Sequence, residues 1–218
     1  MARQERGIRS RHSILEAAAA VFGERGYDAA STNEILARAG LTRGALYHHF
    51  PSKEAIAAAL AEAQGDALVV PEQPVKLQAV IDLTLSFSTR LQTDMVLRAS
   101  VRLAVERSSF SASAQAPYNQ SITVVEDLLR QAEKQGELLP GADLSEVAAT
   151  IVGAFTGLQV MSEAYSSRKD LPARVSALWR LLLPGLAASG MLPRLRTSCP
   201  PASAPESPTG TSGETAQA

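Results

Sequence analysis

Residues 42–48 bring a hydroxyl, a guanidinium, a phenol and an imidazole close together, on Thr42, Arg43, Tyr47 and His48. If this segment is helical, Arg43 and Tyr47 are neighbours on its outer side, because side chains four positions apart face the same way. Such groups donate hydrogen bonds to phosphates and to the base edges of DNA, and a guanidinium pairs best with guanine. We therefore expect Arg43 to read a base and the others to hold phosphates.

The residues around this segment predict two short helices joined by a sharp turn. Ser31 and Glu34 have the spacing of a capping box, which starts a helix near Thr32. Gly40 ends that helix, because glycine tolerates the left-handed backbone of such a turn, and Thr42 caps the next one. Two short helices with a polar outer face on the second are typical of a helix-turn-helix.

The alternative is that residues 31–53 are a helix–turn–helix passage of an ordinary small helical domain, with no role in DNA binding. The distribution of charge along the chain favours DNA binding. Residues 1–53 hold eight Lys or Arg and five Asp or Glu, whereas the remainder holds 13 and 17. The whole-chain charge of −1 thus hides a basic head on an acidic body, which indicates contact with nucleic acid.

An arginine-rich amino-terminal arm leads into a helix expected over residues 8–25. It could be a solvated tail, but we expect it to bind phosphate. The full set of expected DNA contacts is Arg3, Arg9, Thr32, Thr42, Arg43, Gly44, Tyr47, His48 and Lys53.

Short motifs in the first quarter of the chain resemble the amino-terminal domain of TetR-family transcriptional repressors. They are Gly26-Tyr27, Glu34-Ile35, Ala39-Gly40-Leu41-Thr42, Gly44-Ala45-Leu46-Tyr47, Phe50 and Ser52-Lys53-Glu54. Fragments scattered as far as residue 195 resemble, more narrowly, the γ-butyrolactone-receptor branch of that family. These are Met1-Ala-Arg-Gln-Glu-Arg6, Val70-Pro-Glu-Gln-Pro74, Val101-Arg-Leu103, Gly136-Glu-Leu-Leu-Pro140 and Gly153-Ala-Phe-Thr-Gly157.

Helical periodicity and this resemblance predict an all-α chain in three parts. Residues 1–52 are expected to form a three-helix helix-turn-helix DNA-binding domain, and residues 53–192 a helical-bundle ligand-binding and dimerisation domain. Residues 108–116 read as a loop. The Pro/Ser/Thr/Ala-rich residues 193–218 cannot bury enough apolar surface to fold, so we expect a disordered tail.

The expected second domain combines apolar walls with a few polar groups, which favours a ligand pocket. The expected lining is Leu85, Val101, Val125 and Phe155 as walls, with Gln64, Ser121, Thr156 and Gln159 as polar groups. The alternative is that Thr156 bonds to the preceding turn and Gln64 points to water. The resemblance instead implies that Gln64 and Thr156 orient a ligand.

One position departs from the pattern of the branch. Members that bind signalling lactones usually carry a tryptophan over the ligand, and this chain has Ser121 there, while its single tryptophan is Trp179. Losing an aromatic lid removes roughly 150–250 Å² of packing surface. A lactone could still bind if Tyr118 or another residue covers it, but a larger or different ligand, such as a pathway product, becomes credible.

The last two helices, expected over residues 144–165 and 171–189, resemble the pair that forms a four-helix dimer interface in the family. Gly153 permits close approach of another helix, and leucines recur along the final one. The expected interface residues are Gly153, Leu178, Leu182 and Leu186.

Enzymatic function finds no support in the sequence. All three histidines lie within residues 1–53, and we find no cluster with metal-ligand spacing, no phosphate-binding loop and no nucleophile elbow. We therefore expect no catalysis, metal or cofactor. The single Cys199, the lack of a charged-then-apolar leader and an apolar run of only residues 178–188 predict a cytoplasmic protein, nucleoid-associated through DNA, with no membrane partner.

These features predict a ligand-responsive homodimeric repressor that binds a pseudo-palindromic double-stranded DNA operator. The resemblance implies release by a γ-butyrolactone or related signal and control of secondary-metabolite genes. Two alternatives remain open. One is a pseudo-receptor of the same fold that answers to an antibiotic or intermediate, and the other is a small-molecule carrier that does not bind DNA.

Overall fold

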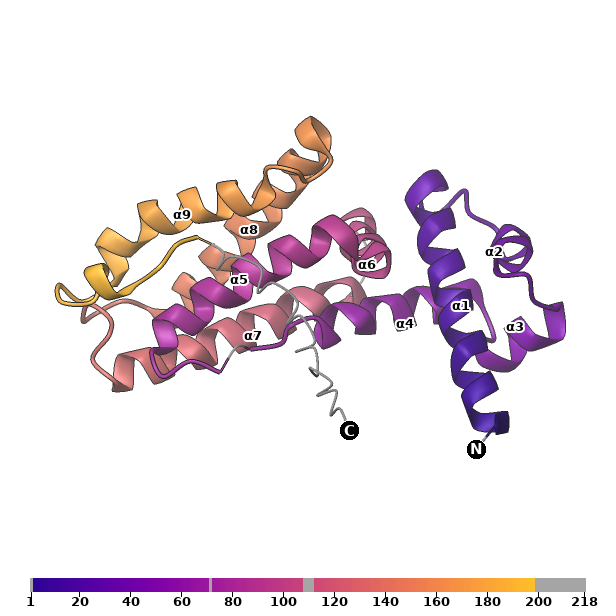
Figure 1. Cartoon of the computed structure of the whole chain (residues 1–218), viewed down its shortest axis with the longest axis horizontal. Coiled ribbons are helices and arrows are strands. Elements are labelled where there is room, and N and C mark those ends of the chain that lie inside the picture. The colour runs from indigo at the N-terminus through magenta and orange to yellow at the C-terminus, as the bar shows by residue number, and fades with distance from the viewer. Residues whose placement is uncertain (1, 71, 108–111, 199–218) are drawn as a thin grey trace, which may run out of the picture.

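The computed structural model describes residues 2–70, 72–107 and 112–198. All regular elements in these residues are helices (Figure 1). The helices are α1 (Ala2–Arg25), α2 (Thr32–Ala39), α3 (Arg43–His49), α4 (Lys53–Asp66), α5 (Lys76–Thr93), α6 (Met95–Arg107), α7 (Ala112–Lys134), α8 (Leu144–Ser166) and α9 (Leu171–Leu186), followed by a short 3-10 helix, η1 (Leu192–Arg194). The expected all-α fold class is confirmed.

The head consists of α1, α2 and α3 around a small apolar core. Ile14 of α1, Ile35 of α2 and Leu46 of α3 are each at most 1% exposed and pack together. Ile56 and Leu60, on the first two turns of α4, complete the same core. Deep burial of large side chains against α1 stabilises α2 and α3, which at eight and seven residues are too short to be stable alone.

The body is a bundle of α5 to α9, with α5 at its centre. α5 packs against α7 and α9, and α7 packs against α8. Eleven of its 18 residues are buried, so it is enclosed on nearly every side, as its broad apolar pattern predicts. Its first turn is capped by the buried Glu137, whose carboxylate accepts hydrogen bonds from the backbone N–H groups of Lys76 (3.1 Å) and Leu77 (2.7 Å).

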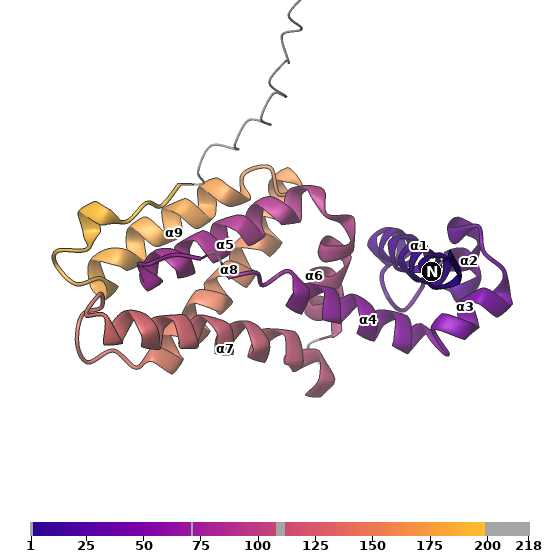
Figure 2. The ribbon, with the colours of Figure 1, turned by 60° about the horizontal axis from the view of Figure 1, so that its bottom comes forward.

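α4 joins the head to the body without a flexible linker (Figure 2). Its first half lies in the head core, while Gln64 near its end is buried against the body. α6 also reaches the head, where Ala99 and Leu103 belong to the head core. The division expected after residue 52 therefore falls at the start of a helix that is shared by both parts.

Three sequence-based expectations about segment ends are wrong. The amino-terminal arm is not separate, because α1 is continuous from Ala2. Residues 112–116, expected in a loop, are helical and Pro117 lies inside α7; residues 108–111 are outside the described part. The expected tail begins too early, because Arg196 exchanges backbone hydrogen bonds with the side chain of Gln78 at 2.8 and 3.0 Å. Residues 199–218 are outside the described part.

α8 is the one described helix that is long and apolar enough, by composition, to cross a membrane. The sequence placed the most apolar run later, at residues 178–188. Apolarity of this kind is weak evidence for a membrane span, because helices of bundles meet the same criteria, and α8 packs against α7 and α9 here.

Candidate DNA-binding head and ligand cavity

Local capping fixes the turn between α2 and α3. The Ser31 hydroxyl accepts a hydrogen bond from the Glu34 N–H (3.2 Å), and the Glu34 carboxylate accepts one from the Ser31 N–H (3.0 Å), which confirms the capping box. Gly40 follows α2 with φ of 64°, a left-handed conformation that favours glycine. Thr42 caps α3 by accepting a hydrogen bond from the Ala45 N–H at 3.3 Å.

The outer face of α3 presents polar groups to solvent. Arg43, Gly44, Tyr47 and His48 are all exposed, while Leu46 is buried beneath them. The Arg43 guanidinium carbon lies 5.7 Å from the centre of the Tyr47 ring, so the two side chains form a stacked pair. Among the described residues, Arg43 has no ion-pair partner within 4 Å, so its charge is available to an external group.

The hydroxyl of Tyr47 also reaches the start of α2. Hydrogen bonding to Thr32, and then to Arg43, lowers the pKa of Tyr47. Thr32 is half-buried, and this contact ties the first turn of α2 to the exposed face of α3. The structure therefore brings four of the expected DNA contacts into one exposed patch and places Thr32 at its edge.

Lys53 has a structural role that the sequence did not predict. Its ammonium group donates hydrogen bonds to the backbone carbonyl oxygens of Tyr27 (2.9 Å) and Ala30 (3.0 Å) and lies 4.5 Å from the centre of the Tyr27 ring. These contacts close the loop between α1 and α2. A phosphate contact by Lys53 stays a prediction that must compete with these bonds.

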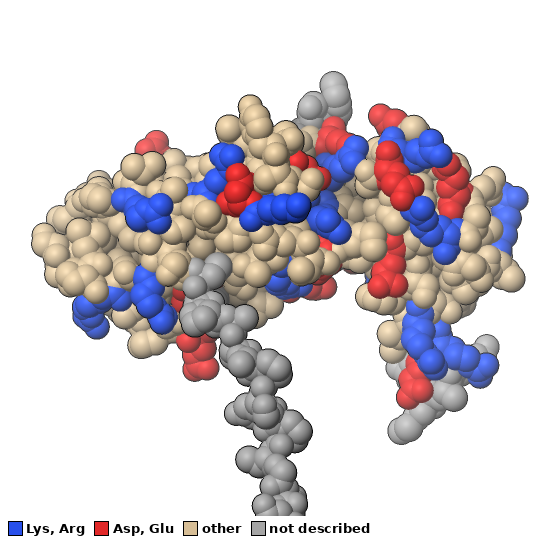
Figure 3. Space-filling view, turned by 45° about the horizontal axis from the view of Figure 1, so that its top comes forward, with Lys and Arg blue, Asp and Glu red and all other residues tan. Residues whose placement is uncertain are grey.

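The expected arm residues lie on the first turns of α1. Arg9 is exposed and its Nε donates to the carbonyl oxygen of Glu5 at 3.4 Å; of Arg3, only the backbone is described. Basic side chains gather at the end of α1 that carries the N-terminus (Figure 3). At the other end of α1 the charges are paired, with Arg38 2.6 Å from Glu24. The basic surface is thus concentrated at the amino-terminal end of α1 and on α3.

A small apolar cavity of about 60 Å³ lies in the body, between α4, α5, α6, α7 and α8. Seven of the eight expected pocket residues line it: Gln64, Val101, Ser121, Val125, Phe155, Thr156 and Gln159. Leu85 does not, because it points into the body core, where it is 1% exposed. From the same helix, Leu83, Thr84 and Phe87 face the cavity instead.

The polar groups of the cavity differ in whether they already have partners. Thr156 donates to the Val152 carbonyl (2.8 Å) and Ser121 to the Pro117 carbonyl (2.9 Å), so both bond to their own preceding turns. Gln64 does not point to water: it is 6% exposed, and its Oε1 has no hydrogen-bond partner among the described residues. A buried acceptor without a partner is costly, and a donor on a ligand would satisfy it.

Trp179 does not cover the cavity but supports one of its walls. It is fully buried in the body core, and its Nε1 donates to the hydroxyl of Thr84 at 2.8 Å. Tyr118, from α7, does line the cavity beside Ser121, and burial raises the pKa of its phenol. Sequence spacing could not predict that Thr84 lies between Trp179 and the cavity, since α5 and α9 are distant along the chain.

The outer face of α8 and α9 is apolar and exposed. Gly153 is exposed and Leu178 and Leu182 are half-buried, but Leu186 is only 6% exposed and packs in the core of its own chain. Larger exposed apolar side chains that the sequence reading missed lie nearby, namely Met161 (48%), Tyr165 (77%) and Leu181 (80%). Exposed apolar groups of this size on neighbouring helices are typical of an interface.

Comparison with known proteins agrees with this architecture. Residues 14–60 match the family described as bacterial regulatory proteins, tetR family, and residues 75–188 match the tetracyclin repressor-like C-terminal domain. The A-factor receptor protein of Streptomyces griseus is 37% identical over 196 residues, which are 90% of this chain and 70% of that protein.

Two solved structures extend the likeness to three dimensions. TylP, a TetR regulator from Streptomyces fradiae, is 43% identical with a TM-score of 0.80, over 88% of this chain and 93% of that one. A gamma-butyrolactone receptor described as ArpA-like is 29% identical with a TM-score of 0.72, over 87% and 94%. The resemblance to the γ-butyrolactone-receptor branch is thereby confirmed, and the chain belongs to the TetR family of bacterial transcriptional regulators, a family of regulators and not of enzymes.

Proposed function

We propose that this regulator is a homodimeric repressor that leaves its operator when a small, largely apolar signalling molecule of γ-butyrolactone or related type enters the body cavity. In this proposal the repressor controls genes of secondary metabolism, such as those for antibiotic biosynthesis. One observation carries the proposal above all others. The unpartnered acceptor of Gln64 faces the cavity from α4, the helix whose other end is built into the core of the head.

The size of the cavity explains how a ligand could act on the head. A volume of about 60 Å³ is several-fold below the roughly 300–1,000 Å³ of pockets that hold small molecules. Binding therefore requires the walls to move apart, and one wall is formed by Gln64 of α4 and by Leu68, two residues beyond the end of that helix. The ligand binds the expanded form more tightly than the compact form. The equilibrium between these two forms shifts by no more than this difference in binding free energy.

The exposed patch on α3 supports DNA binding. Arg43 is exposed beside Tyr47 and has no ion-pair partner among the described residues, so its guanidinium can pair with guanine, while Thr42 and His48 are exposed to contact phosphates. In a dimer joined through the apolar face of α8 and α9, two heads would reach half-sites separated by about one helical turn of DNA, roughly 34–36 Å, or a multiple of it. Release then follows when movement of α4 changes the spacing of the heads.

A gel shift on the promoter of the chain's own gene, and on neighbouring promoters, tests the proposal. We expect a specific, salt-dependent complex that a synthetic γ-butyrolactone, or an extract of the producing culture, dissociates. No specific complex at low salt would contradict the repressor and favour a carrier. A complex that neither the lactone nor the extract affects would contradict the ligand response.

A pseudo-receptor that answers to an antibiotic or intermediate is the second candidate. It is favoured by Ser121 at the position where lactone-binding members usually carry tryptophan, since the only tryptophan here is buried elsewhere. The same gel shift separates the two, because dissociation by biosynthetic products without dissociation by lactones would assign the pseudo-receptor. A thermal-shift titration with the same compounds gives an independent readout.

A further inference from the structure

A second and larger recess lies where the head meets the body. It has a volume of about 450 Å³ and is walled by α1 of the head and by α6 and α8 of the body, together with the turn that follows α8. The residues that α1 contributes near the recess include Ala19, Ala20 and Gly23, whose small size leaves room beside the helix. The opposite wall is rich in charge.

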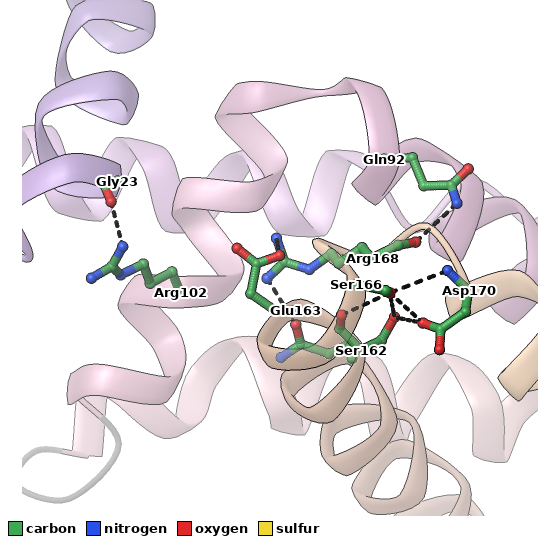
Figure 4. A network of polar contacts seen from close by, with 9 residues as sticks. Gly23, Gln92, Arg102, Ser162, Glu163, Ser166, Arg168 and Asp170 are labelled. Atoms are coloured by element: carbon green, nitrogen blue, oxygen red, sulfur yellow. Dashed lines mark hydrogen bonds and ion pairs between the residues drawn. The ribbon is translucent and has the colours of Figure 1, made fainter.

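Arg168, in the turn between α8 and α9, has a buried guanidinium in this recess. Its side chain is 6% exposed, and it extends towards Glu163 and towards the helix that carries Arg102 (Figure 4). Nη1 lies 3.1 Å from the Glu163 carboxylate and Nη2 donates to the Gln159 Oε1 at 3.0 Å. Nε has no hydrogen-bond partner among the described residues.

The arginines of the recess outnumber the carboxylates that are free to pair with them. Arg98 has no ion-pair partner in the described structure, and it lines the same recess as Arg168. Burial, with repulsion from Arg98 and Arg102, lowers the pKa of Arg168 despite the opposing effect of Glu163.

The other two acids of the recess are already engaged. Glu24 binds Arg38 at 2.6 Å, and Glu106 binds Arg102 at 2.6 Å while accepting from the Tyr27 N–H at 3.3 Å. The third acid of the recess, Glu163, is about half exposed and pairs with Arg168. Two guanidinium groups beside one half-solvated carboxylate leave an excess of positive charge in a partly enclosed space.

We propose that this recess is a second ligand site, which binds a small molecule through a phosphate or carboxylate group held between Arg98 and Arg168. A bidentate anion matches the planar donors of two guanidinium groups and relieves their mutual repulsion. The recess does not overlap the proposed lactone cavity, but the two share one wall, the side chain of Gln159. The inference does not depend on the proposed function.

An occupant of this site would contact both parts of the molecule. Arg102 donates a hydrogen bond to the Gly23 carbonyl near the end of α1, so the wall of the recess is also the contact by which α6 holds the head (Figure 4). An anion bound beside this contact bridges α1 to α6 and α8. Its affinity therefore depends on the position of α1 relative to α6 and α8.

Calorimetric titration of the full-length, DNA-free protein with inorganic pyrophosphate, and separately with citrate, tests the site. Ionic strength is held constant with potassium chloride so that general screening does not change. We expect one anion bound per chain, and the probe that binds more tightly identifies phosphate or carboxylate as the preferred group. Absence of binding by both probes would overturn the proposal.

Matched variants distinguish this site from general attraction. Arg98→Gln removes a charge without breaking any ion pair of the described structure, and we expect it to weaken binding about tenfold or more. Arg168→Lys, which keeps the charge but loses the planar donors, should also weaken it. Arg130→Gln, on the exposed side of α7, should leave binding unchanged. Equal affinity in Arg98→Gln and Arg130→Gln would show an adventitious ion only and overturn the site.

Discussion

The head and the body cavity place their functional groups in opposite environments. On the head, Arg43 and Tyr47 stand on the outside of a short helix, and local caps determine where they point. In the cavity, Gln64 and Gln159 are 6% and 2% exposed and are brought together by helices far apart in the sequence. DNA can be bound by side chains on an exposed surface, whereas a small apolar ligand binds in an enclosed pocket.

This difference predicts which side-chain substitutions each region tolerates. A side chain on the outer face of α3 can be removed with little effect on folding, because it makes few packing contacts. A side chain at the cavity packs within the bundle as well as lining the proposed ligand site, so its removal should alter stability too. Substitutions of the two kinds should therefore separate operator binding from stability.

Trp179→Ala should have the largest effect on stability. Trp179 is fully buried and holds Thr84 beside the cavity, so its truncation should lower the free energy of unfolding by about 3–5 kcal/mol. Denaturant unfolding followed by circular dichroism measures the change. Val69→Ala, at a residue that is 64% exposed, serves as the control. A loss of under about 1 kcal/mol for Trp179→Ala would show that the cavity wall does not depend on this residue.

Arg43→Ala should weaken operator binding without changing stability. Loss of a guanidinium that pairs with a base costs about 1–3 kcal/mol, or roughly fivefold to over a hundredfold in affinity, and relaxes specificity at that position. Fluorescence anisotropy with operator and mutated-operator duplexes measures both. Arg130→Ala, far from the head on α7, is the control. Unchanged affinity for the operator would refute base reading by Arg43.

Gln64→Leu should have the converse effect, sparing the operator and impairing the response to ligand. The leucine fills similar space but removes the unpartnered acceptor, so about tenfold more ligand should be needed to dissociate the complex. Gln131→Leu, on the exposed side of α7, controls for the change of residue type. An unaltered ligand titration would mean that Gln64 does not contact the ligand.

Asp170→Asn should have the smallest effect, a loss of stability that is present above a pH of about 4 and disappears in acid. Hydrogen bonds from Ser162 and Ser166 lower the pKa of Asp170 to about 2. A lowered pKa means that the ionised form stabilises the fold above pH of about 4, and that this stabilisation is lost as the pH falls towards 2. Thermal unfolding across this range should show a steeper loss in the native protein than in the variant. Parallel curves would contradict the role of Asp170.

Much of the head could be predicted from the sequence because its determinants are only three or four residues apart. The Ser31–Glu34 capping box, the turn at Gly40 and the cap at Thr42 need no knowledge of the rest of the chain. The exception is Lys53, whose carbonyl partners lie more than 20 residues earlier. Its structural role depends on how α4 docks, which spacing alone does not reveal.

The cavity could be predicted only in part. Polar residues within apolar helices drew attention to Gln64 and Gln159, but α5 is apolar on nearly all sides, so periodicity did not show that Thr84 faces the cavity and Leu85 the core. The recess beside Arg168 was missed altogether, because it forms between segments that are more than 50 residues apart in the sequence. Both depend on how helices pack, and many packings satisfy the same apolar pattern.

The central claim is that occupation of the body cavity and binding of the operator oppose each other through α4. Thermodynamic linkage makes this effect reciprocal, so the operator must weaken the ligand by the same factor as the ligand weakens the operator. The most direct test is calorimetric titration of the dissociating compound into the free dimer and into the dimer saturated with operator. We predict weaker binding to the complex, by a factor of about 5–150, and equal affinity in the two titrations would contradict the claim.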